Sequence, residues 1–224
     1  MDAPVDGTGK SSRPKSVTEH KTVLLHEVTA ALLDAPRLSQ IAEPRFLDLT
    51  LGGGGHSAAL LAGHPRATVF AIDRDAQALE RSGAALAPYR ERIRLLQGNF
   101  GNIAELIRQG TRGSDDAILF DGIVADLGLS SDQLGAAVRG FSFREEGPLD
   151  MRMDLSMELT AEKLLYESSA RELERIFRSG DVGRFSGALA NLIVQRRPLR
   201  TTIDLARICE SVIRPSRRDS SRRL

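Results

Sequence analysis

The sequence has one cysteine, no tryptophan and no long apolar run. Cys209 is the only thiol among the 224 residues, which excludes an internal disulfide and a metal site built from cysteines. No run of about 18 apolar residues is present, so no membrane-spanning helix is expected. The N-terminus lacks the apolar segment of a secretory signal peptide. These absences predict a soluble, cytoplasmic protein that binds neither a metal nor a membrane.

Aromatic residues and net charge are also low. Aromatic residues make up 4% of the chain and the formal net charge is +1, so the chain as a whole is not a polycation. Positive charge gathers at the end of the chain, where residues 196–224 hold nine arginines against three acidic residues. This basic end is either a solvated face or a surface that binds phosphate groups.

The most informative stretch is an apolar run that leads into four glycines. Residues 46–51 have the pattern of a buried strand, residues 52–55 are all glycine, and an apolar helical series follows with Ser57 as its expected cap. Glycine lets a ligand approach the backbone closely, and a helix start offers unpaired N–H groups. Strand, glycine turn and helix are typical of a site for a nucleotide-like ligand. The alternative is a flexible turn with no ligand.

An acidic residue supports the ligand interpretation. Residues 67–72 form a second buried-strand pattern that ends in Asp73, about 20 residues after the glycines. An acidic side chain in that place commonly binds the hydroxyl groups of a ribose. We therefore expect Asp73 to face the same ligand as the glycine turn.

Strand and helix patterns alternate through the first part of the chain. We expect helices over residues 20–33, 57–62, 76–86 and 103–107, and strands over residues 46–51, 67–73, 93–96 and 117–127. This alternation predicts an α/β fold with a parallel, doubly wound sheet, whose ligands bind at the carboxyl ends of the strands. Three polar residues at such ends are therefore candidate site residues: Asp73, Asn99 and Asp126.

The pattern divides the chain into three parts. Residues 1–19 are rich in Pro, Gly, Ser, Thr and Lys and are expected to form a disordered tail. Residues 20–131 carry the strand patterns. From residue 132 to residue 224 only helical spacing is found, with capping boxes that begin at Ser169 and Thr201. We expect this last part to be a helical subdomain with a basic end.

Five motifs together resemble the ribosomal RNA small subunit methyltransferase H family. They follow the family's order over residues 20–154: HKTVLLHE at 20–27, DLTLGGGGHS at 48–57, AIDRD at 71–75, DLGLSSDQL at 126–134, and RGFSF with GPLDMRMD at 139–154. The resemblance implies a class I S-adenosylmethionine-dependent methyltransferase with a Rossmann-like sheet and an inserted helical subdomain. It also implies methylation of N4 of a cytidine in the decoding region of 16S rRNA, in the small ribosomal subunit.

The resemblance implies roles for seven residues at the cofactor. The contacts to S-adenosylmethionine would come from Gly54, Gly55 and His56 at the glycine turn, Asp73 at the ribose, Phe100 against the adenine, and Asp126 and Gln133 at the end of the pocket. Asp126 is also the candidate catalytic residue. A hydrogen-bond acceptor near the exocyclic amine of cytosine would favour the pyramidal nitrogen of the transition state. The alternative is that Asp126 only holds the cofactor.

Three residues of the last motif are candidates for contact with the RNA substrate. Phe141 and Phe143 are suited to stack on an unstacked base, as in many RNA-binding proteins. The alternative is that they pack the helical region onto the sheet. Arg152 would hold a phosphate or pair with its acidic neighbours. His56 is predicted to be neither a metal ligand nor a general base.

The sequence also departs from the family pattern. The last strands of the family's sheet and its HPATR-type motif are absent. Residues 179–184 also lack the family's usual Tyr-Gly-Glu-Glu character. We therefore expect a C-terminally truncated member with an incomplete sheet, whose fourth strand has an unpaired edge. The absent strands give one alternative function, a non-catalytic remnant that binds S-adenosylmethionine or rRNA without turnover. The glycine turn and Asp73 alone give another, a nicotinamide-dependent oxidoreductase. The oligomeric state is open, with a homodimer as one option.

Overall fold

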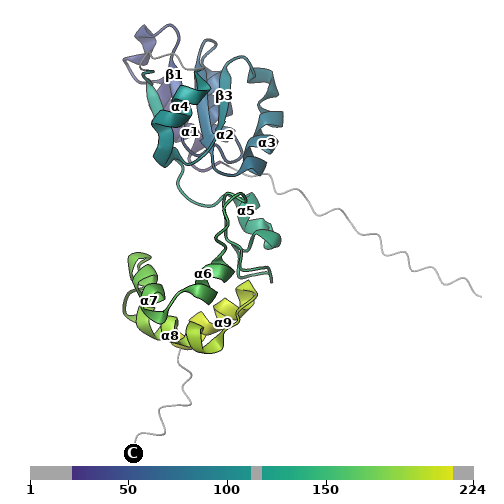
Figure 1. Cartoon of the computed structure of the whole chain (residues 1–224). Coiled ribbons are helices and arrows are strands. Elements are labelled where there is room, and N and C mark those ends of the chain that lie inside the picture. The colour runs from purple at the N-terminus through teal and green to yellow at the C-terminus, as the bar shows by residue number, and fades with distance from the viewer. Residues whose placement is uncertain (1–21, 112–117, 214–224) are drawn as a thin grey trace, which may run out of the picture.

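Two lobes joined by an extended segment make up the structure (Figure 1). It is a computed structural model in which residues 22–111 and 118–213 are described. The predicted disordered tail, residues 1–19, lies outside the described residues, as do residues 214–224 of the basic end. One lobe contains a sheet flanked by helices, and the other is helical.

A parallel sheet of four strands forms the first lobe. The strands are β1 (Arg45–Asp48), β2 (Thr68–Asp73), β3 (Ile93–Gln97) and β4 (Gly122–Val124), in the order β3-β2-β1-β4. All three pairings are parallel, and Asp48 pairs with both Ala71 and Val124. The predicted α/β class with a parallel sheet is therefore confirmed.

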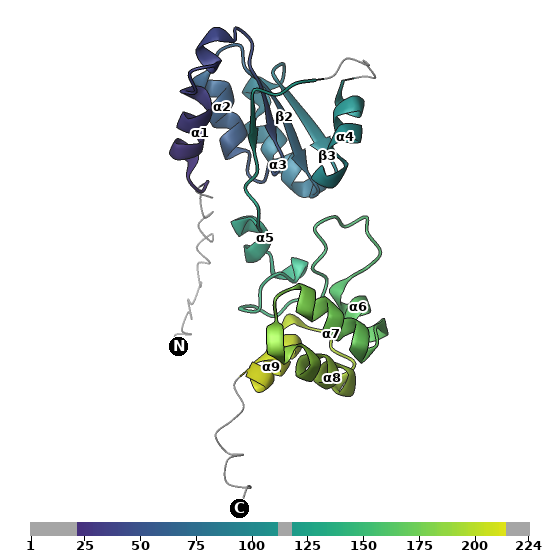
Figure 2. The same ribbon diagram turned by 90° about the vertical axis from the view of Figure 1, so that its left-hand side faces the viewer.

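Helices cover both faces of this sheet (Figure 2). The helices α1 (Leu25–Leu33), α2 (Gly55–Gly63) and α3 (Ala76–Ala85) pack on one face, against a core that includes Phe46 and Val69. The helix α4 (Ile103–Gly110) packs on the other face, against Leu47, Phe70 and Ile72. Successive strand residues point to opposite faces, so both faces need apolar side chains. This explains the nearly continuous apolar runs of the sequence.

Several local predictions were wrong in detail. The first helix begins at Leu25, so residues 22–24 lie outside it, and the first strand ends at Asp48. Ser57 does not cap α2: the helix begins at Gly55, with Gly54 at the N-cap in a left-handed conformation. Ser57 is buried in the first turn instead, and its hydroxyl donates to Asp48 at 2.7 Å. The fourth strand is also shorter than expected. The strand begins only after Asp121, whose carboxylate accepts a hydrogen bond from the backbone N–H of Arg45 at 2.8 Å.

The second lobe is built from helices around its own apolar core. It contains α6 (Ala161–Glu167), α7 (Ala170–Ser179), α8 (Ser186–Arg196) and α9 (Thr202–Ile213), and α5 (Ser131–Gly135) lies in the connecting segment (Figure 1). The predicted capping boxes are present at Ser169 with Glu172 and at Thr201 with Asp204. Single 3₁₀ turns occur at Leu38–Gln40, Ala87–Tyr89, Phe100–Asn102, Ala137–Arg139 and Gly183–Phe185. The division at residues 131 and 132 stays a prediction.

The strand β4 forms one edge of the sheet. Among the residues that the structure describes, no strand pairs with its outer side. The predicted unpaired edge is therefore present in the described part of the chain.

Candidate functional site

A pocket of about 540 Å³ opens at the carboxyl ends of the strands. The segments that follow each of the four strands contribute to its wall, with Thr50 after β1, Asp73 at the end of β2, Asn99 after β3 and Asp126 after β4. Parallel sheets bind their ligands at this edge, and the volume is in the usual range for small-molecule sites. The predicted site residues Gly55, His56, Asp73, Phe100, Asp126 and Gln133 all line this pocket.

The glycine turn lies between β1 and α2 with two residues in the left-handed region. Gly52 has φ of 51° and Gly54 has φ of 79°. Gly52, Gly53 and Gly55 line the pocket, whereas Gly54 is not among the lining residues. A side chain at Gly54 would lie 3.0 Å from Leu86, just after α3. Gly54 thus allows close packing of the turn on the neighbouring helix, and Gly52 and Gly53 leave the backbone open to a ligand.

The carboxylate of Asp73 is held in place by two backbone N–H groups. One oxygen accepts from Gly52 at 2.8 Å, and the other accepts from Asp75 at 2.9 Å. Each carboxylate oxygen can accept more than one hydrogen bond, so both oxygens keep capacity for hydroxyl donors of a ligand. The first contact also fixes the glycine turn against the end of β2.

The other strand ends are held by local hydrogen bonds. The side chain of Asn99 accepts from the N–H of Gly101 at 2.9 Å, which starts a short turn and leaves Phe100 40% exposed at the pocket wall. The backbone N–H of Asp126 donates to the hydroxyl of Thr50 at 2.8 Å. This bond joins the segment after β4 to the segment after β1. Asp126 itself is exposed.

Thr22 and Val23, just before α1, lie against the glycine turn. The ring of His56 is buried, and its Nε2 is 3.2 Å from the carbonyl oxygen of Val23. A side chain at Gly55 would overlap the side chain of Thr22. Thr22 and Val23 therefore form part of the pocket wall. Sequence reasoning did not assign them to the site, although the motif at residues 20–27 was the available signal.

A second pair of residues missed by sequence reasoning lies behind Asp73. Asp75 caps α3, where its carboxylate accepts from the N–H of Gln77 at 3.1 Å. The same carboxylate accepts from Gln133 at 3.2 Å and from Arg139 at 2.9 Å. Burial acts to raise the pKa of Asp75, but the hydrogen bonds from Gln133 and Arg139 hold it below its usual value. Gln133 therefore lines the pocket and is held there by its hydrogen bond to Asp75.

None of the three residues predicted to contact RNA is among those that line this pocket. Phe141 and Phe143 line a separate apolar pocket of about 420 Å³ beside α9. Phe143 is 71% exposed, and Phe141 lies under the guanidinium of Arg139. Arg152 makes a two-pronged ion pair with Asp150, with N–O distances of 2.8 and 2.7 Å. This pairing favours the alternative in which Arg152 pairs with its acidic neighbours.

Asp48, below the pocket floor, is a buried carboxylate. It accepts from Ser57 and from the N–H of Thr50, at 2.7 and 3.1 Å. Burial nevertheless raises the pKa of Asp48 above its usual value of 3.8. Because the folded pKa exceeds the unfolded one, ionisation opposes folding. The free energy of unfolding is therefore not reduced below the unfolded pKa, and its reduction grows until the pH passes the folded pKa.

We therefore expect Asp48→Asn to increase the free energy of unfolding relative to the parent chain, more strongly as the pH rises. Urea unfolding between about pH 4 and about pH 8 measures this. Asp204→Asn is the matched control of opposite sign, because backbone hydrogen bonds from Arg200 and Thr201 lower the pKa of Asp204. Its loss of stability should be full and constant above about pH 4 and should shrink as the pH falls below that value, which urea unfolding extended to about pH 3 measures. A pH-independent effect of Asp48→Asn would contradict the expectation.

Comparison with known proteins shows to which family the chain belongs. A family model described as the MraW methylase family matches residues 17–223. The chain belongs to the MraW methylase family. This confirms the resemblance found in the motifs, and it leaves the oxidoreductase alternative without support.

Several curated relatives carry one name, ribosomal RNA small subunit methyltransferase H. The protein of Acaryochloris marina is 43% identical over 205 residues, which are 92% of this chain and 63% of the relative. The protein of Cyanothece sp. is 46% identical over 175 residues, or 78% and 56%. The protein of Mycolicibacterium gilvum is 39% identical over 203 residues, or 89% and 53%. The chain thus spans between about half and two thirds of the length of these MraW relatives.

Solved structures overlap with the chain only in part. An rRNA methylase from Streptococcus thermophilus is 28% identical, with a TM-score of 0.29, and covers 37% of this chain and 45% of its own. Within residues 22–111 and 118–213, no group of three or more His, Cys, Asp or Glu is placed to hold a metal ion. In the same residues, no helix is long and apolar enough to cross a membrane.

Proposed function

We propose that this chain binds S-adenosylmethionine and takes part in methylating N4 of a cytidine in the decoding region of 16S rRNA. The observation that carries the proposal is the pocket at the strand ends in a member of the MraW methylase family. In it, a glycine turn faces a carboxylate whose oxygens are oriented by the backbone. Curated relatives named as small subunit rRNA methyltransferases support the RNA substrate.

The residues of the pocket fit this cofactor. Asp73 would accept hydrogen bonds from the two ribose hydroxyls, because each of its oxygens keeps acceptor capacity. Gly52 and Gly53 leave room for the cofactor against the backbone. Phe100 offers an exposed ring for contact with the adenine. When bound, S-adenosylmethionine supplies a methyl group on a positively charged sulfur.

Positioning accounts for much of the rate of such a transfer, because the acceptor nitrogen must approach in line. The N–H of Asp126 is held by Thr50 at 2.8 Å, which fixes the backbone at this point. Asp126 is exposed at the pocket, and in this proposal its carboxylate would accept a hydrogen bond from the amine that is methylated. The alternative role, holding the cofactor alone, makes a different kinetic prediction.

We expect Asp126→Asn to lower kcat for methyl transfer by about 100-fold or more, in the range typical for loss of a positioned acceptor. The dissociation constant of S-adenosylmethionine should change less than about threefold. Both are measured, by incorporation of labelled methyl groups and by calorimetric titration. The control is Asp121→Asn, at the opposite end of the strands, which should change neither quantity. A large rise in the dissociation constant with little effect on kcat would assign Asp126 to cofactor binding.

The experiment that tests the whole proposal is methyl transfer to small ribosomal subunits that lack the modification. The 224-residue chain should incorporate labelled methyl groups from S-adenosylmethionine, and digestion of the rRNA should yield N4-methylcytidine. Saturable binding of the cofactor with no incorporation would instead support the second candidate, a protein that binds cofactor or rRNA without turnover.

A further inference from the structure

A buried ion pair joins the end of β2 to the segment between the lobes. Asp75 is 2% exposed and Arg139 is 6% exposed, and the Nη1 of Arg139 is 2.9 Å from the Oδ2 of Asp75. Removing two charges from water is unfavourable, and such pairs persist where further hydrogen bonds complete them. The additional hydrogen-bond partners of Asp75 and Arg139 therefore show which segments of the chain the pair holds together.

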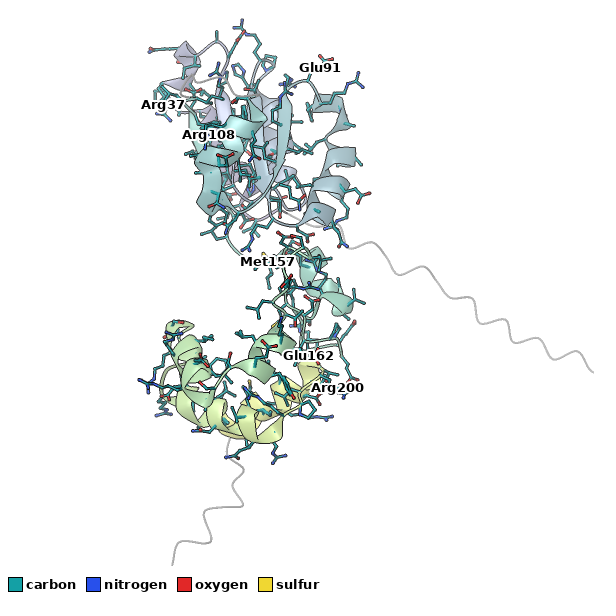
Figure 3. All side chains as sticks on the ribbon, viewed as in Figure 1. Arg37, Glu91, Arg108, Met157, Glu162 and Arg200 are labelled. Carbon is teal, nitrogen blue, oxygen red and sulfur yellow. The ribbon has the colours of Figure 1, made fainter. Side chains whose placement is uncertain are left out.

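The other arm of the guanidinium holds a second part of the chain. Nη2 of Arg139 donates to the carbonyl oxygens of Arg152 and Met153, both at 2.9 Å. Met153 lines the pocket. In Figure 3 the nearby Met157 lies at the junction of the lobes, and its sulfur is 3.4 Å from Arg74, next to Asp73. One side chain thus fixes the segment of residues 152–153 against the sheet.

A third segment is attached through Gln133. Its Nε2 donates to Asp75 at 3.2 Å, and its Oε1 accepts from the N–H of Ser130 at 3.0 Å. Gln133 and Ser130 both line the pocket. Asp75 therefore accepts hydrogen bonds both from Arg139 and from Gln133, which lies in the wall formed after β4.

The network continues to the proposed cofactor carboxylate. The N–H of Asp75 donates to one oxygen of Asp73, and the other oxygen accepts from Gly52 in the glycine turn. A continuous series of hydrogen bonds thus leads from Arg139 through Asp75 and Asp73 to Gly52. Asp73, the wall residues Gln133 and Met153, and the glycine turn share this one support.

We propose that Arg139 is a positioning residue for the pocket: through Asp75 it holds Asp73 and the wall residue Gln133, and it holds the wall residue Met153 directly. Only the identity of the ligand in this inference rests on the proposed function. Arg139 itself is behind the wall and is not among the residues that line the pocket. Its effect is therefore exerted through the residues it holds.

Arg92 provides a matched control. Its Nη1 donates to the carbonyl oxygens of Leu61, His64 and Ala67, at 3.0 to 3.3 Å, near the amino ends of the strands. It too is an arginine that joins separate segments through backbone carbonyls, but at the edge of the sheet opposite the pocket. Arg92→Gln should thus reproduce a general loss of stability without the local effect.

Hydrogen exchange of the ligand-free chain tests the positioning directly. In Arg139→Gln, the amides of Gly52, Asp75 and Ser130 should exchange about tenfold faster or more than in the parent chain, because buried partners are left unsatisfied. In Arg92→Gln these amides should follow only the global change in stability. Arg139→Lys and Arg92→Lys repeat the comparison with milder changes, should a glutamine variant not fold. Equal acceleration in the two series would overturn the proposal.

Calorimetric titration with S-adenosylmethionine tests the consequence. The dissociation constant should rise about tenfold or more in Arg139→Gln, since small displacements of positioning groups have large effects. It should recover in part in Arg139→Lys, and change less than about twofold in Arg92→Gln. Unchanged affinity in Arg139→Gln would overturn the positioning role. Absence of binding by the parent chain would overturn the proposed cofactor alone, because hydrogen exchange decides the positioning role independently.

Discussion

Replacement of Asp73 with alanine is expected to weaken the binding of S-adenosylmethionine by about two to four orders of magnitude. Two hydrogen bonds from ribose hydroxyls to a carboxylate contribute about 1.5–3 kcal/mol each, and about 1.4 kcal/mol corresponds to a factor of ten. The substitution also removes the acceptor of the Gly52 and Asp75 N–H groups, which loosens the glycine turn. Calorimetric titration of the purified 224-residue chain measures the effect.

Asp121→Ala is the control for this substitution. Asp121 also accepts from a backbone N–H, that of Arg45 at 2.8 Å, but at the amino ends of the strands. It should leave the affinity unchanged. Asp73→Asn should have an intermediate effect, because the amide keeps one acceptor oxygen. If Asp73→Ala binds S-adenosylmethionine within about threefold of the parent chain, then the ribose does not lie at Asp73 and the proposed orientation of the cofactor is wrong.

Replacement of Gly140 with alanine is expected to reduce the free energy of unfolding by about 2–5 kcal/mol. Gly140 has φ of 71°, which an L-residue adopts only at a penalty of about 1–2 kcal/mol. A side chain there would also overlap the carbonyl oxygen of Pro148 and lie 3.0 Å from the N–H of Asp150. Since these are backbone atoms, the turn itself has to move. Urea unfolding measures the loss.

Gly183→Ala separates the two causes of this loss. Gly183 has a similar φ of 63°, but nothing lies within 4 Å of a side chain placed there. It should lose only the conformational part, about 1–2 kcal/mol. Equal losses at the two positions would show that the close approach of Pro148 to Gly140 is not rigid. Gly140 follows Arg139 directly, so its substitution should also raise the dissociation constant of S-adenosylmethionine.

The sheet and much of the pocket could be predicted because their signals are local. An apolar run buried on both faces identifies a strand of a parallel sheet, and a polar residue at its end identifies the ligand edge. Asp73 and Asp126 were found in this way. Local patterns were less reliable where tertiary contacts compete with them. Ser57 has the residue type of a cap, but the buried carboxylate of Asp48 takes its hydroxyl.

The support of the pocket could not be predicted, because its partners are distant in the sequence. Asp75 and Arg139 are 64 positions apart, and no periodicity relates them. Thr22 and Val23 contact Gly55 and His56, which are more than 30 positions further along the chain. For Arg152, sequence reasoning left two partners open, and the structure shows that Asp150 takes its guanidinium. Which polar groups pair is decided by the packing of the fold.

The order of the strands also has a consequence in time. The strand β1 pairs with β2, the next strand along the chain, but also with β4, whose residues lie about three times as far away in sequence. Closing the longer loop is less favourable by about 1 kcal/mol, so β4 should join the sheet last. During synthesis at about 5–20 residues per second, β4 follows β3 from the ribosome by about one to five seconds. For that interval a three-stranded sheet exposes the flank of β1, and the segment carrying Asp126 reaches the pocket only when the interval ends.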